Sequence, residues 1–179
     1  RDSGESDNSI ALFTRDFGLV WARGSAVRRE SSKMRGALQT ATRSRVSLIR
    51  GKRGWRMAGA TAIEMPHADR LEGARAFARI SELVRRLVAG EESNQYLYDT
   101  LAEAHRQMIG QALTPELRGT VEIVCVARML YSLGYISTEA LSTALFTHTA
   151  YATEHLVEAE AVREDLLTSI NRALSEAQL

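Results

Sequence analysis

The hydrophobic period of the sequence changes near residue 65, and this change limits the folds that the chain can adopt. Before it, short runs with β-branched and aromatic residues lie between glycines, over 19–23, 44–49 and 55–58. Such runs are typical of the strands of a small barrel or meander. After it, apolar residues recur every three or four positions, which is the period of amphipathic helices. The sequence therefore predicts an α+β chain whose strands precede its helices, with the boundary between Ile63 and Asp69.

Start and stop signals divide the second part into a bundle of four or five helices. Thr114 and Pro115 are a hydroxyl cap and a first-turn proline, which together favour a helix start. Glycine often ends a helix in the left-handed conformation, and glycines follow the first three periodic segments, at Gly90, Gly110 and Gly134. We expect a short helix to open at Ser137 and one long helix to cover 152–177. The predicted domains are residues 1–65 and 66–179.

Charge is distributed unevenly between these two parts. The whole chain has a formal net charge of +1, from 23 Lys and Arg against 22 Asp and Glu. Residues 1–60 hold 13 basic and 5 acidic residues, a net charge of +8, and the other 119 residues carry a net charge of −7. Such asymmetry points to a polyanion-binding part and a part with a different task.

Basic residues are densest over residues 23–56, where Glu30 is the one acidic residue. Trp55 lies within this span, and Trp21 lies just before it, between Arg15 and Arg23. Cations neutralise nucleic-acid phosphates with release of counterions, and exposed aromatic rings stack on bases. Arginine suits this task because its planar fork can hold a phosphate by two hydrogen bonds. The alternation over 44–49 puts Val46 and Leu48 on one face of a strand and Arg43, Arg45 and Ser47 on the other. The candidate nucleic-acid-binding residues are Arg23, Arg28, Arg29, Lys33, Arg35, Arg43, Arg45, Lys52, Arg53, Arg56 and Trp21.

A solvated basic face with both tryptophans in the core is the alternative interpretation. For each tryptophan taken alone, core packing is the favoured one. Residues 26–35 read as a polar loop between strands, either a phosphate-binding loop or a solvated connection.

Residues able to support catalysis are sparse. The four histidines, His67, His105, His148 and His155, lack the spacing of a metal-binding helix motif. A glycine-rich phosphate loop with its lysine is absent from the sequence. We therefore expect no enzymatic activity, no catalytic residue, no metal and no cofactor.

The single cysteine, Cys125, lies between Val124 and Val126. This setting predicts a buried structural thiol in a reducing, intracellular compartment. Apolar runs stay well short of a membrane span, and the first residues have no signal-peptide character. We expect a cytoplasmic, nucleoid-associated protein, and because the sequence does not start with Met, its natural first residues are expected to be missing.

Two blocks of residues, which together span nearly the whole sequence, form a recognisable pattern. In the first part the similar residues are GESD at 4–7, IALFT at 10–14, FGLV at 17–20, GSAVRR at 24–29, SK at 32–33 and LQ at 38–39. In the helical part they are LV at 83–84 with Leu87, LY at 97–98 and ARMLYSLGY at 127–135. The first block resembles the N-terminal oligonucleotide-binding (OB) barrel of the RecO family of DNA repair and recombination mediators. The second block resembles the helical domain of the same family.

This resemblance implies a mediator that is not an enzyme, binds single- and double-stranded DNA and anneals complementary strands. It implies RecR and the C-terminal tail of the single-stranded-DNA-binding protein as partners, and indirectly the recombinase RecA. The acidic, apolar tail would enter a groove of the helical domain flanked by Arg85, Arg86, Arg106 or Arg128. Some of these arginines could instead pair with Glu82, Glu103 or Glu122.

Two departures from the family pattern carry expectations of their own. Many members have a four-cysteine zinc module after the Leu-Gly-Tyr segment, whereas residues 136–142 here have no cysteine; we expect no zinc. The sequence also begins where the first barrel strand of the family should finish. The barrel would then lack that strand or take it from elsewhere.

Three other functions remain open at this stage. The same basic barrel could be an RNA-binding module, which composition does not separate from a DNA-binding one. An enzyme would need a site assembled from distant residues. A purely structural protein would tolerate alanine at Arg28, Arg29 and Lys33.

Overall fold

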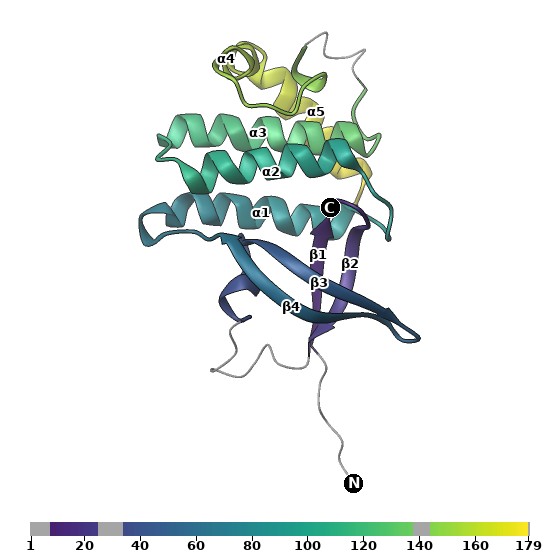
Figure 1. Cartoon of the computed structure of the whole chain (residues 1–179). Helices are drawn as coiled ribbons and strands as arrows, with labels where there is room; N and C mark the ends of the chain where they lie inside the picture. Colours follow the sequence, from purple (N-terminus) through teal and green to yellow (C-terminus); the bar gives the residue numbers. More distant parts are fainter. Residues whose placement is uncertain (1–7, 25–33, 138–143, 179) are drawn as a thin grey trace.

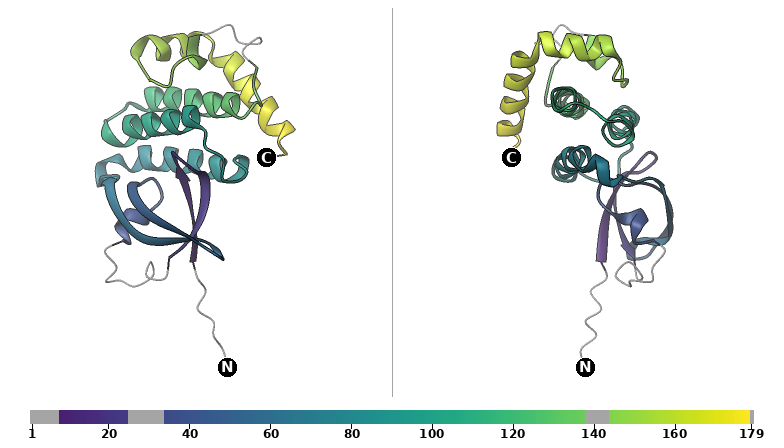
Figure 2. Two further views of the ribbon diagram at one scale, coloured as in Figure 1. Left: turned by 45° about the vertical axis from the view of Figure 1, so that its right-hand side comes forward. Right: turned by 90° about the vertical axis from the view of Figure 1, so that its left-hand side faces the viewer.

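The computed structural model describes residues 8–24, 34–137 and 144–178, in which a sheet lies against stacked helices (Figure 1). Helix α1 lies next to the sheet, α2 and α3 lie beyond it, and α4 lies farthest away (Figures 1 and 2). Strands come first in the chain and helices follow. The predicted α+β class is confirmed.

The sheet consists of two antiparallel hairpins that meet in the middle. The first hairpin joins β1 (Asn8–Thr14) to β2 (Gly18–Gly24), and the second joins β3 (Arg43–Gly51) to β4 (Gly54–Glu64). The strand order is β1-β2-β4-β3. Strands β2 and β4 are parallel and are paired at two positions, Ala22 with Trp55 and Arg23 with Arg56.

Three of the four strands contain the glycine-bounded runs of the sequence, while β1 was not marked by that pattern. Its run Ile10-Ala11-Leu12-Phe13 is continuously apolar instead of alternating. Along β3 the alternation is as predicted, with Val46 and Leu48 partly buried and Arg45 and Ser47 exposed. The sheet is open among the described residues, because β1 and β3 are its two edges. The short helix η1 (Gly36–Leu38) precedes β3.

The helical part follows most of the predicted caps. After η2 (Ala68–Arg70), α1 covers Leu71–Leu87, α2 covers Gln95–Gly110 and α3 covers Pro115–Ser132. The Thr114 hydroxyl accepts a hydrogen bond from the Leu117 amide at 3.3 Å, as the cap signal predicts. Asn94, which the sequence did not mark as a cap, accepts one from the Leu97 amide at 2.9 Å.

One long helix over 152–177 is a wrong prediction. After η4 (Ala144–Phe146), the chain forms α4 (Thr153–Ala161) and α5 (Arg163–Glu176), which turn sharply at Val162 (Figure 2). Val162 has φ −114° and ψ 22°, outside the helical region. The turn lets both helices contact α3, where Ala159 of α4 and Leu166 and Ile170 of α5 are buried. The short helix expected from Ser137 falls mainly on 138–143, outside the described residues.

The core has two parts. The larger part joins the helices around fully buried side chains such as Ile80, Val121 and Leu130. The smaller part lies inside the sheet and consists of Val20, Ala22, Trp55 and Met57. Strand β1 borders both parts, because Leu12 packs against the sheet core and the Phe13 ring stacks on Tyr98 of α2 at 6.3 Å between centroids.

Polar contacts also connect the sheet to α2. His105 is buried, and its Nε2 hydrogen-bonds to the carbonyl oxygen of Ala41 at 2.9 Å. Arg15 at the tip of the first hairpin pairs with Asp99 at 3.6 Å and lies over the Tyr98 ring. These contacts hold the sheet in a defined orientation on the helices.

Two helical glycines give a matched test of the close packing of α1 on α2. A Cβ atom on Gly73 of α1 would lie 2.0 Å from the backbone oxygen of Met108, whereas one on Gly119 of α3 would meet no atom closer than 3.7 Å. We expect Gly73→Ala to lower the free energy of unfolding by about 1–3 kcal/mol, because α1 and α2 must move apart. Gly119→Ala should raise it by about 0.5–1 kcal/mol. Urea unfolding of both variants checks this, and equal effects would contradict the close helix contact.

Candidate nucleic-acid interface

The face of the sheet that points away from its core carries arginines and exposed apolar side chains. Residues Val20, Ala22, Trp55 and Met57 point into the sheet core, so the residues between them point outward. Trp21 is 48% exposed on β2, and Ile49 is 47% exposed on β3. The outer face of the sheet is defined here as Trp21, Arg23, Arg45, Ile49 and Arg56.

Two arginines are neighbours on this face. Arg23 and Arg56 are register partners across β2 and β4, and Arg56 is also paired with Ile49 across β4 and β3. Adjacent strands are about 4.8 Å apart, and like charges directly opposite each other destabilise a sheet. An anion placed between these two guanidinium groups would remove this repulsion.

The β3–β4 turn extends the cationic surface. It carries Lys52 and Arg53, both exposed, and the Arg23 guanidinium donates a hydrogen bond to the Arg53 carbonyl oxygen. Arg50, in contrast, lies over the buried Trp55 ring and pairs with Glu91 at 3.5 Å. The two tryptophans therefore have different roles: Trp55 is a core residue, and Trp21 is available at the surface.

The cations of the sheet differ from those of the helices in their ion pairing. Among the described residues, no carboxylate lies within 4.0 Å of the basic groups of Arg23, Arg45, Lys52, Arg53 or Arg56. Helical arginines mostly have such a partner, in the pairs Arg75–Glu72, Arg79–Glu122, Arg85–Glu82, Arg106–Glu103 and Arg163–Glu160. The positive charge of the sheet is thus left for an external anion.

Other predicted binding residues lie elsewhere. Arg43 begins β3 opposite Glu64, and the exposed Arg35 precedes η1, so both are at the end of β3 remote from the β3–β4 turn. Arg28, Arg29 and Lys33 fall outside the described residues. The structure gathers Trp21, Arg23, Arg45, Lys52, Arg53 and Arg56 in or next to the outer face. Ile49, which sequence reasoning missed, belongs with them.

The four arginines proposed to flank a groove of the helical part have different surroundings. Arg85 pairs with Glu82, and this hydrogen bond lowers the pKa of the Glu82 carboxyl. Arg106 pairs with Glu103 within α2, as the alternative interpretation anticipated. Arg86 is exposed and has no ion pair among the described residues.

The prediction that Arg128 flanks a groove is wrong, because its side chain is fully buried. Its Nε donates to the carbonyl oxygen of Leu145 at 2.7 Å, and its Nη1 donates to those of Thr149 and Ala150. The guanidinium also lies 4.9 Å from the ring centroid of Tyr151. Arg128 therefore holds the segment before α4 and has no surface for a partner. Its place in the apolar run 124–130 was the sequence signal for a buried position.

The thiol of Cys125 is buried, as the sequence predicts. Cys125 is fully buried in α3, and burial raises the pKa of its thiol to about 12. It is therefore protonated and unreactive at neutral pH. Among the described residues, no cluster of three or more His, Cys, Asp or Glu side chains is placed to hold a metal ion. Within the same residues, none of the helices is long and apolar enough to span a bilayer.

Comparison with known proteins finds a similarity to RecO proteins. The chain is 32% identical over 112 residues to the DNA repair protein RecO of Pelotomaculum thermopropionicum, which covers 62% of this chain and 44% of that protein. It is 36% identical over 109 residues to the DNA repair protein RecO of Desulforudis audaxviator, covering 58% of this chain and 43% of that protein. Over these residues the chain is similar to RecO proteins. The resemblance seen in the sequence is thereby confirmed.

The similarity to RecO is limited in extent. The chain spans less than half the length of the two RecO proteins that it matches. No protein-family model matches the chain. The similarity therefore covers only part of those proteins, and the candidate site rests on the outer face of the sheet.

Proposed function

We propose that the chain serves DNA repair by binding DNA on the outer face of its sheet, without an enzymatic activity of its own. In this proposal it binds single- and double-stranded DNA, anneals complementary strands and helps to load a recombinase. The RecO relatives, which are named as DNA repair proteins, support the repair role. The outer face supports nucleic acid as the ligand.

The observation that carries the proposal is the adjacent pair Arg23 and Arg56 without a carboxylate partner among the described residues. A phosphate between these side chains would accept hydrogen bonds from both. Trp21 and Ile49 lie next to the pair and offer flat apolar surface to unpaired bases. Cations and stacking surface on one sheet face are the combination that single-stranded nucleic acid requires.

Annealing follows physically from such a face. Two complementary strands repel each other through their phosphates, and a dense cationic surface screens this repulsion. The outer face of the sheet is exposed and not enclosed in a pocket, so bound bases keep access to a second strand. The face therefore concentrates both strands without blocking their pairing.

The proposed fold of the sheet part is an OB barrel. Two hairpins joined through β2 and β4 form a curved sheet with an apolar interior, in agreement with most of such a barrel. A further strand between β1 and β3 would close it. OB barrels bind single strands on the outer face of their central strands, which is where Arg23 and Arg56 lie.

The proposed partners are RecR, the tail of the single-stranded-DNA-binding protein and, indirectly, RecA. For the acidic tail, Arg86 on α1 is the best contact of the arginines considered, because it is exposed and has no ion pair among the described residues. Arg85 and Arg106 would first have to leave Glu82 and Glu103.

A salt titration tests the proposed function. A labelled single-stranded DNA should bind with an affinity that falls steeply with salt, at a logarithmic slope of roughly −3 if four or five phosphates are contacted. RNA of equal length is the competitor. A slope near zero would contradict the proposal, and preferential binding of RNA would favour the RNA-binding alternative.

A further inference from the structure

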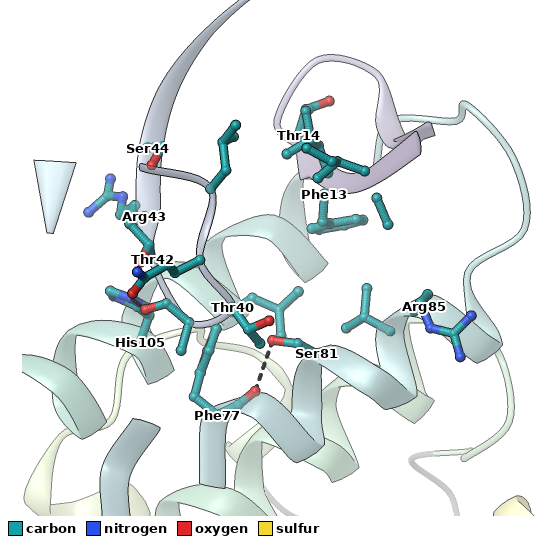
Figure 3. A pocket seen from close by; sticks show the side chains of 18 of the residues that line it. Phe13, Thr14, Thr40, Thr42, Arg43, Ser44, Phe77, Ser81, Arg85 and His105 are labelled. Atoms are coloured by element: carbon teal, nitrogen blue, oxygen red, sulfur yellow. Dashed lines mark hydrogen bonds between the residues drawn. The ribbon is translucent and has the colours of Figure 1, made fainter. Parts of the chain in front are cut away.

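The groove between the sheet and helix α1 offers little to a polyanion. Its volume is about 570 Å³, and apolar side chains such as Phe13 of β1 and Phe77 of α1 line it (Figure 3). Arg43 and Arg85 lie at opposite sides of the groove (Figure 3), and Arg85 is already paired with Glu82. A second cationic surface of the sheet must therefore lie outside this groove.

The β3–β4 hairpin ends in such a surface. Lys52 and Arg53 form the centre of its turn, Gly51 and Gly54 are register partners on either side, and all four residues are exposed. Gly54 has a φ of +89°, a backbone conformation that glycine adopts without steric cost. Figure 1 shows the hairpin reaching past β1 and β2, away from the helices. The two cations are thus presented to solvent at the tip of a two-stranded ribbon.

Contacts at the base of the turn hold it in place. The Arg23 guanidinium of β2 donates a hydrogen bond to the carbonyl oxygen of Arg53. Arg50 lies over the Trp55 ring and pairs with Glu91 of the α1–α2 loop at 3.5 Å. These contacts leave the side-chain cations of the turn without a carboxylate partner among the described residues. A turn held in this way loses little conformational entropy when it binds.

The chemistry of the turn suits a duplex better than a single strand. Residues 51–54 include no apolar side chain, so unpaired bases would have nothing there to stack on. A duplex keeps its bases stacked and presents phosphates along both sides of each groove. The two strands of a hairpin lie about 4.8 Å apart before side chains are added. Such a ribbon fits the major groove, about 12 Å wide, and is too broad for the minor groove, about 6 Å wide.

We propose that the β3–β4 turn is a separate binding site for double-stranded DNA, and that it enters the major groove with Lys52 and Arg53 against phosphates. The inference rests on the proposed function and divides it: the turn binds the duplex, and the outer face with Trp21 binds the single strand. Arg53 can hold a phosphate by two hydrogen bonds, whereas Lys52 acts as a point charge. Phosphate contacts carry no sequence information, so duplex binding is independent of sequence.

Fluorescence anisotropy with a labelled duplex and with one of its strands, at physiological salt, tests this division. The variant Lys52→Gln, Arg53→Gln should bind the duplex about tenfold or more weakly than the parent chain. Its logarithmic salt slope for the duplex should be less steep by about 1.8, because two phosphate contacts are lost. Its affinity for the single strand should stay within about threefold, since distant charges are screened at this salt. Unchanged duplex affinity, or equal losses for both ligands, would overturn the division.

Trp21→Ala should show the reverse selectivity, because it removes a stacking surface and no charge. We expect single-strand binding to weaken about fivefold or more, with duplex binding unchanged. The matched control is Arg86→Gln, Arg172→Gln, since both arginines are exposed on helices and have no ion pair within the described part of the chain. If the control weakens duplex binding as much as the turn variant does, net charge explains the loss and the turn site is overturned.

Blocking each groove of a mixed-sequence duplex tests how the turn docks. Netropsin occupies the minor groove and should leave binding unchanged, whereas glucosylated hydroxymethylcytosine fills the major groove and should weaken binding about tenfold. The opposite pattern would overturn the major-groove contact. A parent chain that binds neither duplex nor single strand would contradict the proposed function itself. A parent chain that binds both, with no selectivity in either variant, would contradict this inference alone.

Discussion

Arg128→Ala is expected to lower the free energy of unfolding by about 3–5 kcal/mol, a large share of the total for a domain of this size. Alanine removes the donors that serve the carbonyl oxygens of Leu145, Thr149 and Ala150. It also leaves a cavity beside the Tyr151 ring. Thermal and urea unfolding measure the loss.

Two further substitutions separate the causes of this loss. Arg128→Met keeps most of the volume and removes the positive charge together with its hydrogen bonds, so the loss of stability should be smaller than for alanine. Arg172→Ala changes an exposed arginine of α5 and should shift stability by no more than about 0.5 kcal/mol. A loss below about 1 kcal/mol for Arg128→Ala would show that the segment before α4 does not depend on it.

The double substitution Arg23→Glu, Arg56→Glu is expected to weaken single-stranded DNA binding about 100-fold at low salt. Each arginine contributes about 1.4 kcal/mol or more through a charge-assisted hydrogen bond to phosphate, and the two contributions together correspond to that factor. The new carboxylates would add repulsion. Titration of labelled DNA at two salt concentrations measures the effect.

The matched control reverses two arginines that already have partners. Arg75 pairs with Glu72, and Arg163 pairs with Glu160, both at 2.6 Å on helices. Arg75→Glu, Arg163→Glu makes the same change in net charge, and we expect less than a threefold effect on DNA affinity. Equal losses in both double variants would mean that net charge, and not the outer face, determines binding.

Much of the fold could be predicted because local signals and tertiary packing agree. Glycine-bounded runs mark β2, β3 and β4, and the Thr114–Pro115 signal marks the start of α3. The break at Val162 could not be predicted, because its neighbours are good helix formers and only packing on α3 requires the turn. Strand β1 could not be recognised from alternation, because its residues face both parts of the core and its apolar run is continuous.

Prediction of the candidate site was less complete. The sequence shows that many cations lie in the strand region. It does not show that Arg23 and Arg56 are neighbours, because this depends on the pairing of β2 with β4. It also does not distinguish Trp21 from Trp55, since both lie among arginines; strand register exposes the first and buries the second. Arg128 was assigned to a surface that it does not reach.

The neighbouring guanidinium groups of Arg23 and Arg56 also affect the unbound protein. Their repulsion is present whenever no anion lies between them, so the free state is less stable than its packing alone would allow. A bound polyanion removes this penalty and adds its own binding free energy to the folded state. If this pair binds DNA as proposed, binding and folding are thermodynamically linked through it. The two residues proposed to hold phosphate are then residues without which the unbound protein would be more stable.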